Sequence, residues 1–235
     1  KKNFSVGNYI RFAQKATLDI QKRGKLPILV GGTGLFIKGV IDGIPTAFVP
    51  RNLKLRKNLG EKDAGELFEI LAQLDPIKAG SMNRSDKLNP RRLIRGIEVA
   101  TWGLERKTPR LFKKPKYELL VIGLQASLGS LSNKIEKRVD KRIKDGVEAE
   151  IKKLISSGIS WDSQSMTSLG YRQWRDYFEK KVTKEEVINN WKKEELRYAK
   201  RQLAWFKKDV RINWFDSQDG NLYKKVEELV KKWYP

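Results

Sequence analysis

The chain has 235 residues, contains neither cysteine nor histidine, and carries 50 lysine and arginine residues against 28 acidic ones, which gives a formal net charge of +22. The absent residue types exclude disulfides, thiolate zinc sites, cysteine nucleophiles and serine–histidine triads, so a general base must be a carboxylate, a lysine, a tyrosine or a backbone group. A charge this far from zero predicts a polyanionic partner, with RNA or DNA favoured over a membrane surface, and a merely solvated lysine-rich surface is the alternative.

The beginning of the chain carries a helix pattern followed by a strand pattern. Ser5 stands where a helix N-cap is expected, before apolar residues spaced by three and four positions, and Arg23-Gly24-Lys25 ends this helix. The short apolar run at residues 26–30 has the length of a buried parallel strand and is too short to cross a membrane. No signal peptide is visible, and we expect a soluble cytoplasmic protein.

A glycine turn, Gly-Gly-Thr-Gly, follows at residues 31–34 and leads directly into an apolar helical stretch. Strand, glycine turn and helix in this order present backbone N–H groups to a ligand at the carboxyl end of a strand. Thr33 adds a hydroxyl that can both donate and accept a hydrogen bond. The turn matches neither the dinucleotide fingerprint nor the phosphate loop, so a plain βα turn is the alternative.

The middle of the chain is predicted to be helical. After a linker at residues 44–50, helices are expected near residues 51–60, 63–74 and 90–102, and a basic loop covers residues 103–117. Arg91, Arg92 and Arg95 cluster on the helix that Pro90 begins, where their guanidinium groups suit the binding of phosphates. Ordinary surface charge is the alternative interpretation of this cluster.

The second half of the chain combines two short strands with longer helices. Strands are predicted at residues 118–123 and 211–215, and helices run from Leu128 to a break at Gly146 and over residues 221–233. A serine-rich loop leads to Gly170-Tyr171-Arg172-Gln173, whose ring, guanidinium and amide can read an unstacked base. A helix start with polar caps is the alternative for this motif.

A long helix near the C-terminus is predicted to begin at Thr183, which forms a capping box with Glu186, and to run through Phe206. Basic residues recur on one face of this helix at spacings of three and four, flanked by Arg201 and Trp205. A basic ridge beside an aromatic ring suits RNA phosphates and stacked bases. A solvated basic face with Trp205 in the core fits the pattern equally well.

Several motifs follow one another along the chain, namely Pro27-Ile-Leu-Val-Gly-Gly-Thr-Gly-Leu-Phe36, Asp75-Pro76, Arg91-Arg-Leu-Ile-Arg-Gly-Ile-Glu-Val99, Gly170-Tyr-Arg-Gln173 and Ala199-Lys-Arg-Gln-Leu-Ala-Trp-Phe206. Their content and order resemble the tRNA dimethylallyltransferase family, also called tRNA isopentenyltransferases. The resemblance extends over about residues 4–216, which is nearly the whole chain.

The resemblance implies an α/β fold that is mostly helical, with a partial parallel sheet like that of the P-loop kinases and a helical insertion that contacts tRNA. It places the core domain at residues 1–48 and 116–235 and the insertion at residues 49–115. The implied reaction transfers a dimethylallyl group from dimethylallyl diphosphate, with Mg²⁺, to N6 of the adenine 3′ to the anticodon. The implied partner is the tRNA anticodon stem-loop. The protein is expected to be a monomer and to have no membrane partner.

The resemblance also implies roles for individual residues. Thr33 is the implied catalytic contact with the substrate adenine, and Gly31, Gly32 and Gly34 form the turn at the diphosphate. The residues implied to contact tRNA are Arg56, Arg91, Arg92, Arg95, Gly170, Tyr171, Arg172, Gln173, Lys200, Arg201, Gln202 and Trp205. No residue of this chain is implied to ligate a metal.

The chain departs from the family pattern in several places. The family's phosphate-binding loop and the aspartate that acts as general base on N6 would both precede Lys1, so this chain alone is expected to bind tRNA without catalysing the transfer. Single departures are Phe36 for a usual tyrosine, Leu128 for arginine, Glu195-Leu196 for Thr-Arg, and Lys207 for arginine. Two alternatives stay open: a tRNA-binding fragment without catalysis, and a small-molecule phosphotransferase of related fold.

Overall fold

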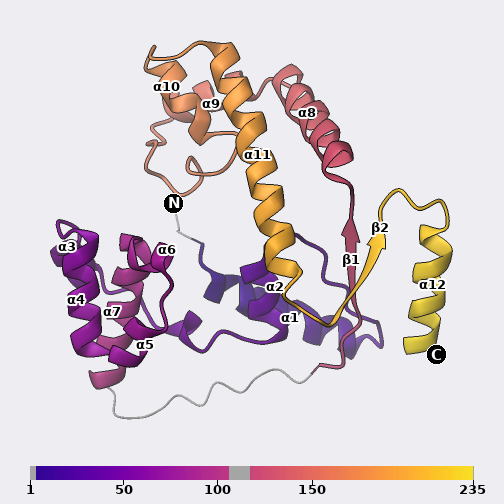
Figure 1. The fold of residues 1–235 in the computed structure, drawn as a ribbon, viewed down its shortest axis with the longest axis horizontal. Coiled ribbons are helices and arrows are strands. Elements are labelled where there is room, and N and C mark those ends of the chain that lie inside the picture. Colours follow the sequence, from indigo (N-terminus) through magenta and orange to yellow (C-terminus); the bar gives the residue numbers. More distant parts are fainter. Residues whose placement is uncertain (1–3, 106–116, 235) are drawn as a thin grey trace. The chain divides into compact units, whose positions relative to one another are not determined.

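A computed structural model describes residues 4–105 and 117–234 of the chain (Figure 1). The described residues group by their contacts into two compact units. We call residues 4–29 and 35–105 the helical unit, and residues 30–34 and 117–234 the strand unit. The division into domains predicted at residues 48 and 116 stays a prediction.

The helical unit begins with α1 (Val6–Lys22), α2 (Gly34–Ile41) and the short 3₁₀ helix η1 (Pro45–Phe48), although Gly34 itself is grouped with the strand unit. The Ser5 side chain accepts a hydrogen bond from the Asn8 N–H at 3.2 Å, which confirms the predicted N-cap. Ile10 on α1 is fully buried and lies against Gly39 on α2. The two helices approach closely there because Gly39 has no side chain.

The rest of the helical unit is a cluster of helices, namely α3 (Leu53–Leu59), α4 (Ala64–Leu74), α5 (Pro76–Gly80), α6 (Arg84–Lys87) and α7 (Pro90–Glu105). The helices predicted near residues 51–60, 63–74 and 90–102 are thus confirmed. Asp63 and Glu66 form a reciprocal capping box that starts α4. Leu67 and Leu71 of α4 are fully buried with Leu93 of α7, and each such side chain contributes about 1.5–3 kcal/mol by leaving water.

The strand unit contains a two-stranded parallel sheet of β1 (Val121–Gln125) and β2 (Ile212–Asp216), with Val121 opposite Ile212 and Gln125 opposite Asp216. These strands overlap the predicted ones at residues 118–123 and 211–215. The strand predicted at residues 26–30 is wrong, because those residues form no ladder and Ile28 and Val30 are 77% and 86% exposed. An apolar run becomes a strand only when another segment pairs with it.

Helices make up most of the strand unit: α8 (Leu128–Lys144), α9 (Val147–Ser156), the 3₁₀ helix η2 (Arg172–Trp174), α10 (Arg175–Phe178), α11 (Lys184–Phe206) and α12 (Leu222–Trp233). Gly146, at φ +90°, separates α8 from α9 as predicted. The predicted capping box of Thr183 and Glu186 starts α11. Trp174 and Trp191 are fully buried in a core that α8, α9 and α11 share.

Among residues 4–105 and 117–234, no helix combines the length and the apolar character that crossing a bilayer requires.

Candidate functional site

The glycine turn packs directly on the long basic helix α11. Gly32 accepts a hydrogen bond through its carbonyl oxygen from Nε2 of Gln202, at 2.6 Å. The indole ring of Trp205 lies against Gly34, in the space that a side chain at this position would occupy. Two motifs that lie far apart in the sequence therefore meet in one place. Thr33 is exposed between the two contacts, so its hydroxyl is open to a ligand.

Replacing Gly34 with alanine is expected to lower the free energy of unfolding by about 1–3 kcal/mol, because the new methyl group would collide with the Trp205 ring. Gly31→Ala is the matched control, since nothing lies within 4 Å of its added methyl group. That control should stay within about 0.5 kcal/mol of the wild type. Urea unfolding followed by circular dichroism measures both variants, and equal losses would show that the Trp205 contact contributes nothing.

A cavity of about 470 Å³ opens beside the middle of α11, lined by Thr167, Leu169, Arg172, Tyr198 and Arg201. The guanidinium of Arg201 lies over the ring of Tyr198, at 5.8 Å from the ring centre. Two guanidinium groups, a phenol ring and a threonine side chain therefore face one space. Such a set suits a ligand that carries both an aromatic base and phosphates.

The Gly170–Gln173 turn that supplies Arg172 is held from inside the protein. Gly170 has a φ of +88° and is packed against the buried ring of Trp191. Gln173 is buried, and its Oε1 accepts a hydrogen bond from the Gly170 N–H at 2.9 Å. Gln173 thus shapes the turn, whereas Arg172 is exposed and reaches the cavity.

The Tyr171 side chain is also fixed by neighbours. Its hydroxyl donates to Oε1 of Glu150 at 2.8 Å, and the guanidinium of Arg142 lies 6.0 Å from its ring centre and 5.1 Å from that of Trp191. Burial and the hydrogen bond to Glu150 both raise the pKa of Tyr171. The phenol therefore stays protonated at neutral pH and serves to hold the turn. Sequence patterns gave no sign of Arg142 or Trp191, because neither lies in a recognisable motif.

The structure places Arg56 and Arg95 around a buried carboxylate in the helical unit. Glu98 is 2% exposed and accepts hydrogen bonds from Arg56 Nε at 2.6 Å, from Arg95 Nη1 at 3.0 Å and from the Asn52 N–H at 3.0 Å. Burial alone would raise the pKa of Glu98, but the hydrogen bonds from Arg56, Arg95 and the Asn52 N–H outweigh burial and lower it from 4.5 to about 2. These two arginines therefore hold an internal carboxylate in this structure.

Arg95 also fixes the segment that leads into the helical cluster. Its Nη2 donates to the carbonyl oxygen of Thr46 at 2.6 Å and to that of Val49 at 2.9 Å. Together with the Asn52–Glu98 bond, these contacts tie residues 46–52 to α7. Glu98 stands three residues after Arg95 in the sequence, and this one-turn spacing was the signal that sequence reasoning did not use.

The remaining residues with implied tRNA contacts lie at the surface. Arg91 and Arg92 are exposed at the start of α7, and Arg92 forms an ion pair with Asp86. Lys200 is exposed on α11. These positions leave the cationic groups open to a large anion, and the ion pair of Arg92 at the surface contributes little to stability.

Acidic side chains that cluster together could serve as metal ligands. Within residues 4–105 and 117–234, no three acidic side chains come together in a way that could hold a metal ion. We assign the expected Mg²⁺ no residue and no step.

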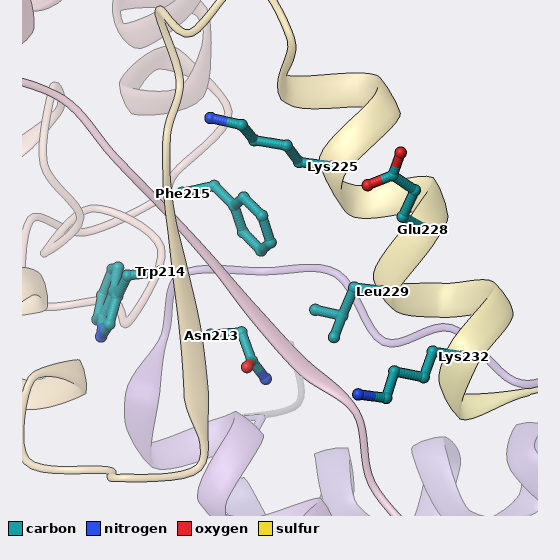
Figure 2. A pocket seen from close by; sticks show the side chains of 7 residues that line it. All are labelled: Asn213, Trp214, Phe215, Lys225, Glu228, Leu229 and Lys232. Carbon is teal, nitrogen blue, oxygen red and sulfur yellow. The ribbon is translucent and has the colours of Figure 1, made fainter.

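A second cavity, of about 450 Å³, lies between β2 and α12 (Figure 2), and its lining residues are Asn213, Trp214, Phe215, Lys225, Glu228, Leu229 and Lys232. Phe215 and Leu229 face each other across this space, whereas Trp214 points to the other side of β2. Lys225 is already paired with Asp219 at 2.6 Å. The mixture of charges and apolar groups selects no ligand class, so we assign this cavity no role.

Comparison with known proteins identifies the family. The family model described as IPP transferase matches residues 1–209. A tRNA dimethylallyltransferase of Carboxydothermus hydrogenoformans is 37% identical over 97% of this chain and 74% of its own length. The solved tRNA isopentenylpyrophosphate transferase of Bacillus halodurans is 34% identical, with a TM-score of 0.66 over 98% of this chain and 73% of that one.

A eukaryotic dimethylallyltransferase solved acting on tRNA is 21% identical, with a TM-score of 0.71 over 98% of this chain and 61% of that chain, and this likeness shows the fold alone. The expected fold class, mostly helical with a small parallel sheet of the P-loop type, is confirmed. The matched family model and the identity to its curated relatives agree on one assignment: this chain belongs to the IPP transferase family.

Proposed function

We propose that the chain acts in the transfer of a dimethylallyl group from dimethylallyl diphosphate to N6 of the adenine 3′ to the anticodon in tRNA. The relatives named above are a tRNA dimethylallyltransferase and a tRNA isopentenylpyrophosphate transferase. The observation that carries the proposal is the contact between the glycine turn and α11, where Gln202 and Trp205 pack on Gly32 and Gly34. This contact places the exposed Thr33 beside a basic helix.

The chemistry of the transfer fits such a place. The carbon–oxygen bond of the donor breaks with its electron pair leaving on the diphosphate, and a bond from N6 to that carbon forms. The proton of N6 passes to a general base. The adenine must leave its stack in the anticodon loop before N6 can react. The developing charge on the diphosphate calls for cationic groups, and the Thr33 hydroxyl is proposed to contact the adenine. Any Mg²⁺ is proposed to arrive with the diphosphate, because phosphate oxygens are ligands that Mg²⁺ prefers.

The cavity beside α11 is proposed to receive part of the tRNA anticodon loop. Arg172 and Arg201 each offer several N–H groups in a planar fork, which suits phosphate oxygens. The Tyr198 ring offers a face on which a base can stack, which contributes about 1–3 kcal/mol per base. A small-molecule phosphotransferase needs no such basic helix, so we favour tRNA.

Binding to two stem-loops tests the proposal. One carries adenines 3′ to the anticodon and the other has those adenines replaced, and both are titrated over a series of salt concentrations by fluorescence anisotropy. We expect a preference of roughly fivefold or more for the adenine loop, because hydrogen bonds that read the edge of one base discriminate against another base by about 1 kcal/mol or more. Equal, steeply salt-dependent binding of both loops would remove adenine recognition from this chain.

Charge reversal at Arg201 is expected to weaken tRNA binding about tenfold near 0.1 M salt and to reduce the slope of log Kd against log salt by about one. Lys137→Glu on α8 is the matched control, because it reverses one positive charge in the same way. Lys137 is exposed and lies outside the cavity lining. It should weaken binding much less. Arg201→Glu without effect on tRNA would favour the phosphotransferase alternative.

A further inference from the structure

One acidic residue stands among the arginines at the cavity beside α11. Glu194 lies on α11, and its carboxylate is bound on both oxygens. Oε2 accepts from Nη2 of Arg172 at 2.8 Å, and Oε1 accepts from Nη1 of Arg197 at 2.6 Å. The Glu194 side chain is 19% exposed, whereas those of Arg172 and Arg197 are 47% and 66% exposed. The carboxylate therefore sits beneath two guanidinium groups that face solvent.

The cluster formed by Glu194 and the nearby arginines has a positive net charge. The pKa of Glu194 is lowered by the hydrogen bond from Arg197 and by the nearby charges of Arg197, Arg172 and Arg201, so the carboxylate is ionised at neutral pH. One negative charge thus lies among three positive ones. Of these three arginines, Arg172 and Arg201 line the cavity. The cluster keeps an excess of positive charge for an anionic ligand.

Each arginine also keeps free donors. A guanidinium has five N–H groups in a fixed plane, and a bond from Nη2 of Arg172 to Glu194 leaves its other nitrogen atoms available. A side chain this exposed samples many rotamers unless a partner restrains it, and ordering it on binding costs about 0.5–1.5 kcal/mol. A carboxylate that holds the guanidinium before the ligand arrives lowers that cost.

We propose that Glu194 is a positioning residue for RNA recognition, which holds Arg172 at the cavity and Arg197 beside it so that their free N–H groups receive the tRNA loop: its phosphates and, at Arg172, the edge of the unstacked adenine. The proposal rests on the proposed function, because it concerns the same cavity and the same ligand. The proposal also predicts that loss of the Glu194 charge impairs RNA recognition, which is the opposite of what electrostatics alone predicts. Removing a negative charge from a basic face would by itself strengthen RNA binding.

Glu194→Gln tests the proposal in the 235-residue chain, with three ligands: the adenine stem-loop, the stem-loop with the adenines replaced, and a plain RNA duplex. We expect the preference for the adenine loop to fall roughly two- to fivefold, the range of an exposed ion pair. Binding of the duplex should stay unchanged or tighten. Glu185→Gln, at an exposed position in the first turn of the same helix, makes the same change of charge and should leave the preference intact.

Two further variants separate positioning from damage to the fold. Glu194→Asp keeps the charge and should retain more of the preference than Glu194→Gln. In an Arg172→Ala background, Glu194→Gln should have much less effect on the preference, because a positioning residue acts only through the group it positions. A general loss of structure would instead lower binding of all three RNAs and would show in the thermal melt.

The outcomes are distinguishable. If the wild type prefers the adenine loop and Glu194→Gln preserves or raises that preference, the positioning role is overturned while the proposed function stands. If the wild type shows no preference between the two loops, adenine recognition by this chain is overturned, and the role of Glu194 falls with it.

Discussion

Gly170→Ala is expected to lower the free energy of unfolding of the strand unit by about 2–5 kcal/mol. The φ of +88° disfavours any residue with a side chain, and this strain costs about 1–2 kcal/mol. The added methyl carbon would also lie 2.5 Å from Cζ2 of Trp191 and 2.9 Å from Nη1 of Arg142. Trp191 is fully buried and has no room to withdraw, so overpacking adds about 1–3 kcal/mol.

Gly158→Ala provides the matched control for this variant. Its φ of +78° is similar, but nothing lies within 4 Å of the added methyl group. It should therefore show the strain alone, and the difference between the two variants isolates the contact with Trp191 and Arg142. Urea denaturation curves measure both. Equal losses at Gly158 and Gly170 would show that the turn does not depend on Trp191.

If the turn positions Arg172, Gly170→Ala also reduces the preference for the adenine loop in protein that remains folded.

Glu98→Ala is expected to lower the free energy of unfolding of the helical unit by about 3 kcal/mol. The variant leaves two arginines and the Asn52 N–H without their common acceptor, and breaking a buried ion pair has an effect of this order. The loss is at the lower end of the range for buried ion pairs, because the side chains of Arg56 and Arg95 are 35% and 31% exposed and can be hydrated again in the variant. Glu69→Ala, exposed on α4, is the control and should change stability by less than about 0.5 kcal/mol.

The same carboxylate gives the stability a dependence on pH. The pKa of Glu98 in the folded protein, about 2, lies below its ordinary value of 4.5, so its stabilisation is fully present above pH 4.5 and disappears as the pH falls towards 2. The difference in unfolding free energy between the wild type and Glu98→Gln should be constant above about pH 5 and shrink below pH 4.5. A difference that stays the same down to pH 2 would mean that Glu98 is not ionised in the fold.

Local signals in the sequence predicted local structure well. The caps at Ser5 and Thr183 each involve a side chain and an N–H three residues later, so each interaction is contained in one short segment of the sequence. The break at Gly146 likewise depends on one residue. The prediction of a strand at residues 26–30 was wrong because a strand requires a second segment to pair with. The pattern of apolar residues does not indicate which segment that would be.

The candidate site was predictable in part. The resemblance implied that Thr33 in the glycine turn and residues 200–205 on α11 contact the same tRNA, and the Gln202–Gly32 bond joins these two segments. The function of single arginines could not be assigned from sequence, because it depends on which carboxylate lies nearby. Arg56 binds Glu98, which lies 42 residues away in the sequence, and Arg172 binds Glu194, which lies 22 residues away. Gln173 was predicted at a surface that reads RNA, yet it is buried and shapes its own turn.

The pairing of β1 with β2 constrains how the chain is made. Val121 pairs with Ile212, so the sheet joins segments separated by about 90 residues that include α8, α9 and α11. At a synthesis rate of about 5–20 residues per second, β1 leaves the ribosome on the order of 5–20 s before its partner exists. The contacts of α4 with α7 span far less sequence and can close during this interval. Translation therefore exposes an unpaired, apolar strand edge for seconds in every copy of this chain, a period in which chaperones have access to it.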